Sequence, residues 1–330
     1  PLVDTTVREL IEAYIKSRRP LGVEETTLEG YRRCANRIYP RIGSICAKDL
    51  TSYQVQEFIA DMGEKYAPKT IRNTESLLSS AYDNAVRLGQ LASNPCKLVT
   101  LPKKDDPKID IFTEEEIIRF LNALRDTRLD YKVAYELALF CGLRRSEICG
   151  LREEHISIPF RTITIEETRH RIDGKNVVQP TKTTSSHRHL SVPEFVMEDI
   201  KALLKEHERF QYRRTDYLVQ DGFGQPIKPS TMTTTIFRIE DKANLPHVSL
   251  HDLRHTFASM LNNAHVDIAM ISRELGHSNI SITLNTYTHV FGNVAESSRG
   301  IADSLNDRFD DRRKTASIMP LSLNEETAEA

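Results

Sequence analysis

The sequence predicts a mainly helical protein with one small antiparallel β-sheet, and three observations support this fold class. Apolar residues recur at helical spacing over residues 7–88 and again beyond residue 194. Between these parts, residues 161–192 are rich in β-branched side chains and contain the hairpin signal Asp173-Gly174. A polar, proline-bearing stretch at 103–110 separates the two helical parts. We therefore expect two domains joined by a linker.

The first domain, residues 1–102, is expected to be a bundle of four amphipathic helices. Thr26 and Thr27 are cap candidates for the second helix, and Pro68 marks the start of the fourth. The four apolar stripes begin at Val7, Leu28, Val55 and Ile71. Helices with such stripes bury them against one another, so this domain is expected to have its own core.

The second domain, residues 111–292, is expected to combine helices with the sheet. Thr113 and Glu116 form a capping box ahead of its first helix, and Gly142 ends the second helix. The segments that favour strands are 162–165, 177–178 and 189–192. Residues 293–309 are expected to form a C-terminal helix, and residues 310–330 lack periodicity and are expected to be a flexible tail.

Composition excludes several classes of protein. No apolar run approaches the roughly 20 residues that span a bilayer, and the N-terminus lacks the features of a signal peptide. The five cysteines are odd in number and have no CxxC spacing, so neither a disulfide framework nor a zinc site is expected. The net charge of −2 does not decide on nucleic acid, because binding needs only a local basic surface. The chain starts at Pro1 without a methionine, which indicates a fragment or a processed product.

Arg144 lies in the segment 142–147 (Gly-Leu-Arg-Arg-Ser-Glu), between the end of one predicted helix and the start of the next. Ser146 is a cap candidate for that next helix. Backbone N–H groups at a helix start favour anions, so Arg144 is a candidate phosphate ligand. Glu147 is a candidate partner that fixes its guanidinium. The alternative is a surface arginine in an ordinary helical ion pair.

His251 and Arg254 lie three residues apart, beside an apolar stripe that includes Leu253 and Phe257. At about 100° per residue, both side chains leave the same flank of a helix. Two donors aimed at one spot suit a phosphodiester transition state, whose negative charge spreads over the non-bridging oxygens. The alternative is a histidine at the edge of the core and a solvated arginine. His255 projects elsewhere, and we interpret it as structural.

Tyr287 follows His277 by ten residues, and Gly276 ends the helix before them. His277 is therefore expected in a turn, with Tyr287 in or near the next helix. A phenol acts as a nucleophile where its neighbours stabilise the phenolate-like transition state. The alternative is a helix-turn-helix reader of DNA in which Tyr287 only packs.

Lys182 lies in the polar turn 179–188, between two predicted strands. A lysine at a hairpin tip can reach a DNA groove and protonate a departing 5′ oxygen. The alternative is a solvated lysine with no part in chemistry.

In their order along the chain, these six residues resemble the active-site set of the tyrosine recombinase (phage integrase) family. The resemblance covers residues from about 110 to 292. In its overall sequence character the chain is similar to integrases of temperate phages and of conjugative transposons from Gram-positive bacteria. The matching motifs are 142–147, Thr181-Lys182-Thr183, His251-Asp252-Leu253-Arg254-His255, and Leu275-Gly276-His277-Ser278 with Tyr287-Thr288-His289. The spacing His251-x-x-Arg254 followed by Leu-Gly-His and a tyrosine is a specific combination.

The resemblance implies a two-domain DNA clamp and a site-specific recombinase that excises and integrates a mobile element or prophage. Tyr287 would attack a DNA phosphate and form a 3′-phosphotyrosyl bond, with Lys182 as the general acid. Glu147 would orient its neighbouring arginine. The groups expected to hold the phosphate are Arg144, Arg254, His251 and His277. The resemblance implies no metal, no cofactor and no ATP.

The resemblance also implies partners and an assembly. The chain would bind double-stranded DNA at core recombination sites and form a homo-tetramer on two such sites, with residues 293–309 either exchanged between subunits or packed within their own. The first-domain residues expected to contact DNA, unless they are merely solvated, are Lys69, Arg72, Arg32 and Arg33. Accessory DNA-bending or excision proteins, a missing N-terminal arm-site domain, and a bacterial cytoplasmic, nucleoid-associated location are expected as well.

Three rival functions remain open from the sequence. A type IB topoisomerase would share the chemistry but relax supercoils without site preference. A non-enzymatic helix-turn-helix regulator would tolerate the loss of Tyr287. A metal-dependent nuclease would need a carboxylate cluster, which we do not find in the sequence.

Overall fold

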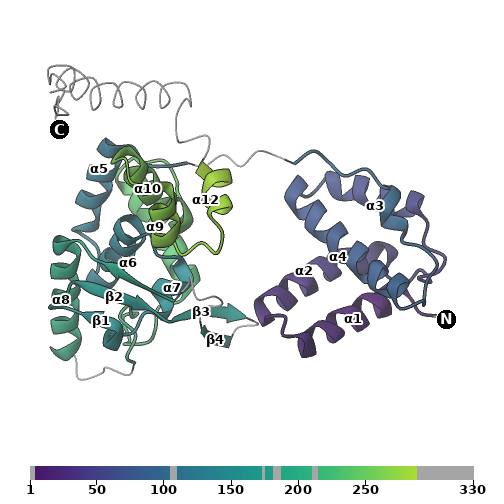
Figure 1. Ribbon diagram of the computed structural model, residues 1–330, viewed down its shortest axis with the longest axis horizontal. Helices are drawn as coiled ribbons and strands as arrows, with labels where there is room; N and C mark the ends of the chain where they lie inside the picture. Colours follow the sequence, from purple (N-terminus) through teal and green to yellow (C-terminus); the bar gives the residue numbers. More distant parts are fainter. Residues whose placement is uncertain (1–3, 105–109, 173–174, 181–186, 210–214, 288–330) are drawn as a thin grey trace, which may run out of the picture. The chain divides into compact units, whose positions relative to one another are not determined.

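Four helices form the N-terminal part of the computed structural model, which describes residues 4–104, 110–172, 175–180, 187–209 and 215–287. Their buried faces share one core, so the predicted four-helix bundle is confirmed. The helices are α1 (Val7–Arg18), α2 (Glu25–Ile42), α3 (Ser52–Gly63) and α4 (Pro68–Arg87), with the short 3-10 helices η1 (Arg19–Leu21) and η2 (Pro95–Leu98) (Figure 1).

The start of α2 differs from the sequence prediction. Its N-cap is Glu24, which is extended (φ −65°, ψ 148°), so Thr26 and Thr27 lie inside the first turn and the prediction that they cap the helix is wrong. Glu25, the first helical residue, is an ion-pair partner of Arg19 and Arg32. These pairs place a carboxylate at the positive end of the helix, where it is favoured.

The second part of the chain is built around α6 (Leu129–Cys141), a helix that is buried on almost every side. Helices α8 (Glu194–Arg209) and α10 (Leu250–Asn263) pack against it (Figure 1). The predicted capping box of Thr113 and Glu116 starts α5. The remaining helices are α5 (Glu114–Leu124), α7 (Arg145–Gly150), η3 (Glu153–His155), α8 (Glu194–Arg209), α9 (Pro229–Lys242), α10 (Leu250–Asn263), α11 (Ile268–Glu274) and α12 (Ile280–Tyr287).

The strands form two small antiparallel sheets where the sequence predicted one. The three-stranded sheet has the order β1 (Ile156–Ser157), β2 (Thr162–Ile165), β5 (Arg188–Ser191). Ile165 of β2 lies opposite Arg188 of β5. The other sheet is the hairpin β3–β4, whose predicted Asp173-Gly174 tip lies outside the described residues. The strands are β1 (Ile156–Ser157), β2 (Thr162–Ile165), β3 (Glu167–Ile172), β4 (Lys175–Pro180) and β5 (Arg188–Ser191). The predicted strand segments fall on β2, β4 and β5.

The chain divides into two compact units. The first contains residues 1–110, 167–180 and 227–232, and the second contains residues 111–166, 181–226 and 233–330. In the described ranges, no helix combines the length and apolar character that a bilayer span requires. Within the same ranges, no three His, Cys, Asp or Glu side chains are arranged to hold a metal ion.

Candidate active site

The end of helix α11 gathers three arginine side chains. Gly276 is in the left-handed region (φ 61°) and closes the helix in a Schellman turn, in which the N–H of His277 donates to the carbonyl of Ser272. Carbonyls at such an end lack backbone partners and carry the negative end of the helix dipole. Three consecutive ones each accept from a different arginine: Glu274 O from Arg188 Nε at 2.9 Å, Leu275 O from Arg254 Nη2, and Gly276 O from Arg144 Nη2 at 3.1 Å. We call these three carbonyls the α11 carbonyl cluster.

Arg144 is the N-cap of α7, and Glu147 binds both its backbone and its side chain. The backbone N–H donates to Glu147 Oε2 at 2.8 Å, and Nη1 donates to Oε1 at 2.7 Å. The prediction that Ser146 caps this helix is wrong, because the extended residue before the first turn is Arg144. The side chain of Arg144 remains 32% exposed, so its guanidinium is accessible to a phosphate from solvent.

Glu147 is a buried carboxylate between two arginines. Arg188 donates two hydrogen bonds to this carboxylate, from Nη1 to Oε1 and from Nη2 to Oε2, each at 3.0 Å. Burial raises the pKa of Glu147, but the charges of Arg188, Arg144 and Arg254 outweigh burial and lower the pKa to about 2. The carboxylate is therefore ionised at neutral pH, and it holds Arg144 as the sequence predicted.

Arg188 is the residue of this cluster that the sequence prediction missed. It begins β5, and the strand alternates so that Arg188 and Leu190 are buried while His189 and Ser191 are exposed. A buried arginine requires an acidic partner, since an unpaired charge is costly inside a protein. The alternation itself is the signal in the sequence, because it places Arg188 on the same face as the apolar Leu190.

Arg254 lies deepest in the site. It comes from α10, is 1% exposed, and donates Nη1 to the carbonyl of Gly142 at 2.6 Å. Gly142 ends α6 in the left-handed region (φ 62°). A Cβ at this position would lie only 2.5 Å from Phe257 Cδ1 of α10, so the backbone approaches α10 more closely than any other residue type allows.

We expect Gly142→Ala to lower the free energy of unfolding by roughly 2–5 kcal/mol. The left-handed backbone costs a side chain about 1–2 kcal/mol, and overpacking adds about 1–3 kcal/mol. Urea unfolding measures the loss. The control is Gly89→Ala, because Gly89 has a similar φ of 68° but open space at its Cβ position. If both variants lost the same free energy of unfolding, the close contact between the Gly142 backbone and Phe257 would not contribute to stability.

His277 lies in the turn between α11 and α12, as predicted. Its Nδ1 lies 2.8 Å from Oγ1 of the fully buried Thr283, which is in α12. Burial lowers the pKa of His277 to about 3, together with the charges of Arg254 and Arg144 and weaker contributions from His251 and Arg188. The ring is therefore neutral at pH 7. If Nδ1 accepts from the Thr283 hydroxyl, Nε2 carries the proton and is a donor.

His251 lies in the first turn of α10 and is exposed, whereas Arg254 on the same helix is buried. Its charge is among the weaker causes that lower the pKa of His277. The ring of His251 also packs edge-on against His255, with centroids 4.5 Å apart. His255 is buried, in line with its interpretation as structural.

The buried His255 gives stability a defined pH dependence. Burial first, and then the neighbouring charge of His251, lower its pKa to about 4. Between about pH 6.5 and 4 the unfolded chain binds a proton that the folded chain does not, so stability is full above this window and falls as the pH drops. We expect His255 to account for a loss of about 2 kcal/mol between pH 7 and pH 5.

Urea unfolding at a series of pH values tests this expectation. His255→Gln should make the free energy of unfolding depend less steeply on pH between pH 7 and pH 5. A slope that is unchanged in His255→Gln would contradict the assignment.

Two predicted catalytic residues have side chains that the structure does not describe. Lys182 lies outside the described residues. Tyr287 is the last residue of α12, and only its place at the helix end is described. It follows Thr283 by one helical turn, so the two positions share a face of α12. The hydrogen bond between His277 and Thr283 therefore ties the helix that carries Tyr287 to the α11 carbonyl cluster.

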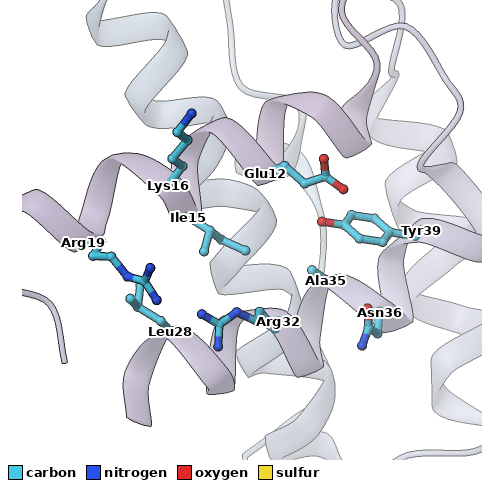
Figure 2. A pocket seen from close by; sticks show the side chains of 9 residues that line it. All are labelled: Glu12, Ile15, Lys16, Arg19, Leu28, Arg32, Ala35, Asn36 and Tyr39. Atoms are coloured by element: carbon cyan, nitrogen blue, oxygen red, sulfur yellow. The ribbon is translucent and has the colours of Figure 1, made fainter. Parts of the chain in front are cut away.

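The structure separates two of the four predicted DNA contacts of the first unit, Arg32 and Arg33. Arg33 lines a groove of about 430 Å³ between α2 and α4. Arg32 lines a separate pocket of about 460 Å³ between α1 and α2, where its guanidinium points towards that of Arg19 (Figure 2). Lys69 is exposed on α4, and Arg72 donates Nε to the carbonyl of Pro102 at 2.9 Å. Arg32 and Arg33 diverge because successive residues of a helix are about 100° apart.

The mainly helical fold has three arginines gathered at the end of α11, and the matches that follow identify the chain as a tyrosine site-specific recombinase. Residues 110–293 match the model of the Phage integrase family, more than half of the chain. The chain belongs to that family.

Curated relatives come from bacteria and phages. A XerC-like tyrosine recombinase of Caldanaerobacter subterraneus subsp. tengcongensis is 30% identical over 289 residues, which cover 79% of this chain and 72% of the relative. The integrase of Mycobacterium phage L5 is 27% identical, over 73% of this chain and 64% of its own length. The ICEBs1 integrase of Bacillus subtilis is 26% identical, over 72% and 66%. The chain thus spans between 64% and 72% of the length of these relatives.

Solved structures share the fold. The Tn1549 transposon integrase in complex with a circular intermediate DNA has a TM-score of 0.80 and 23% identity, over 91% of this chain and all of that chain. A λ integrase tetramer bound to a Holliday junction has a TM-score of 0.66 and 16% identity, over 84% of this chain and 79% of that chain. These likenesses confirm the predicted fold class.

Proposed function

We propose that Tyr287 attacks a DNA phosphate at a core recombination site, forming a 3′-phosphotyrosyl bond and releasing a 5′-hydroxyl. The bond between phosphorus and the 5′ oxygen breaks as the bond to the phenol oxygen forms. Because the covalent link keeps the energy of the phosphodiester, a 5′-hydroxyl from another strand can reverse the step and rejoin the DNA. The observation that carries this proposal is the α11 carbonyl cluster, which places three arginines next to the chain segment that leads to Tyr287.

The charges of the cluster match what the reaction needs. Negative charge spreads over the non-bridging oxygens in the transition state, and fixed donors stabilise it best when they need no reorganisation. Arg144 is the accessible arginine and binds these oxygens directly, while Arg254 supports it from the buried side. Arginine suits this role because its planar fork binds two oxygens at once.

The remaining residues complete the step. His277 is neutral and positioned by Thr283, so it donates a hydrogen bond to the phosphate without adding a charge that titrates near pH 7. His251, exposed on the first turn of α10, donates a second one. Lys182 acts as the general acid that gives a proton to the departing 5′ oxygen.

We further propose that the chain acts on double-stranded DNA as a homo-tetramer that brings two sites together. The λ integrase structures, which include a dimer on a core site and a tetramer on a Holliday junction, support this assembly. In this proposal Lys69, Arg72, Arg32 and Arg33 contact DNA, and residues 293–309 pass to a neighbouring subunit. Accessory DNA-bending or excision proteins choose the direction of recombination, and the protein works at the nucleoid in the bacterial cytoplasm.

A nicked duplex that spans the joined ends of its own element tests the proposal. After cleavage, the short strand beyond the nick diffuses away, which traps the covalent intermediate. The wild-type chain should form an SDS-resistant adduct with this duplex in EDTA. With two intact sites it should give recombinants, and it should not relax a supercoiled plasmid that lacks these sites. Relaxation of the site-free plasmid without recombinants would instead indicate a type IB topoisomerase.

A further inference from the structure

Arg188 belongs to the cluster although nothing in the proposed mechanism gives it a role. It is 7% exposed, it begins β5, and it bonds both to Glu147 and to the carbonyl of Glu274. It therefore links three separate elements: the start of β5, the first turn of α7 and the end of α11. A buried arginine with these partners fixes the position of Glu147, and through it the position of Arg144.

The carboxylate of Glu147 needs such a support. The terminal torsion of a glutamate is broad. The two bonds that Glu147 makes to Arg144 come from the residue whose own orientation is at issue, so they do not fix the plane of the carboxylate relative to β5 and α11. Arg188 contacts both oxygens at 3.0 Å, which sets that plane. In the resulting orientation Oε1 lies 2.7 Å from Arg144 Nη1, and Oε2 lies 2.8 Å from the backbone N–H of Arg144.

Charge gives Arg188 a second effect on Arg144, and this effect also acts through Glu147, whose negative charge Arg188 offsets. If Glu147 were paired with Arg144 alone, its negative charge would cancel the positive charge that attracts the phosphate to Arg144. With Arg188 as a second cation on the same carboxylate, and Arg254 nearby, the cluster keeps a net positive charge. The exposed face of Arg144 is the part of this charge that an incoming phosphate reaches first.

We infer that Arg188 is a positioning residue that holds Arg144, through Glu147, in the orientation needed to bind the scissile phosphate. This inference rests on the proposed function. Arg188 does not touch the DNA itself. Its loss removes the link from Glu147 to β5 and to the carbonyl of Glu274, so Glu147 and Arg144 can shift together away from the phosphate.

The first test replaces Arg188 by Met and follows adduct formation on the nicked duplex described above. Cleavage should slow by about 10- to 100-fold, the effect of a small misplacement of a catalytic group. Affinity for the intact site should stay within a factor of about three. The control is Arg119→Met, which removes a half-exposed guanidinium from α5 and should leave cleavage unchanged. Normal cleavage by Arg188→Met, or a loss of DNA binding as large as the loss of cleavage, would overturn the inference.

A comparison of two further variants covers the case in which Arg188→Met fails to fold, since that variant leaves Glu147 with one cation fewer. If Arg188 acts through Glu147, then Glu147→Gln and the double variant Glu147→Gln/Arg188→Met should cleave at equal rates per folded molecule. A double variant that cleaves at least about tenfold more slowly would show that Arg188 acts by another route, and would overturn the inference.

A substrate with sulfur in place of the bridging 5′ oxygen distinguishes an effect of Arg188 on Arg144 from an effect on the general acid Lys182. A thiolate leaves without a proton, so this substrate restores cleavage when the general acid is impaired. It should not restore cleavage in Arg188→Met, because the defect lies in phosphate binding by Arg144. Restoration would show that Arg188 serves Lys182 instead. Absence of any adduct with the wild-type chain would contradict the proposed function itself, an outcome distinct from all of these.

Discussion

Tyr287→Phe should abolish the covalent protein–DNA adduct while leaving binding to the core site intact. The variant keeps the aromatic ring at the end of α12 and removes only the phenol oxygen that forms the bond to phosphorus. The rate of cleavage should fall by on the order of 10⁴-fold or more, the scale seen when an enzyme loses its nucleophile. SDS gels with labelled nicked DNA measure the adduct, and gel shifts measure binding.

The matched control for this variant is Tyr131→Phe in the same unit, which keeps the ring that stacks on Tyr135. It should form the adduct at the wild-type rate. An adduct with Tyr287→Phe at wild-type levels would assign the nucleophile to another residue. The non-enzymatic regulator predicts a different pattern, in which neither the wild type nor either variant forms an adduct.

Arg144→Lys should slow cleavage by about 10²- to 10³-fold, the usual loss when one donor to a developing oxyanion is removed. An ammonium cannot contact Glu147, the carbonyl of Gly276 and a phosphate with the geometry of a guanidinium fork. Site binding should change little, because many other phosphate contacts contribute to it. Single-turnover cleavage on the nicked duplex measures the effect.

The neighbouring residue provides the control for Arg144→Lys. Arg145 carries the same charge one position along the chain, but it bonds to Thr233 Oγ1 at 3.0 Å and takes no part in the α11 carbonyl cluster. Arg145→Lys should therefore cleave at close to the wild-type rate. Similar rates for the two variants would contradict a specific role of Arg144 and would point to a general effect of charge.

The sequence predicted those parts of the site that depend on local structure. Gly142 and Gly276 mark helix ends because both backbones are left-handed, and such positions favour glycine. Their spacing to Arg144 and His277 then places both residues in turns. The pair of Arg144 and Glu147 was also predictable, because the two residues lie three positions apart at the start of one helix.

The parts that the sequence could not predict depend on contacts between distant segments. Arg254 was expected beside His251 as a donor to phosphate, yet its guanidinium is buried against the carbonyls of Gly142 and Leu275. The local sequence around the end of α11 does not indicate that its three carbonyls accept hydrogen bonds from three arginines. Arg188 was interpreted as part of a polar turn, since its burial depends on the register of β5 against β2.

The most direct measurement is mass spectrometry of the trapped adduct after digestion with a protease and a nuclease. Our account predicts a single modified peptide, which carries a residual 3′-linked nucleotide on the oxygen of Tyr287. The same peptide should be absent from the Tyr287→Phe sample. A nucleotide on any other side chain, or an adduct linked through a 5′-phosphate, would contradict the account.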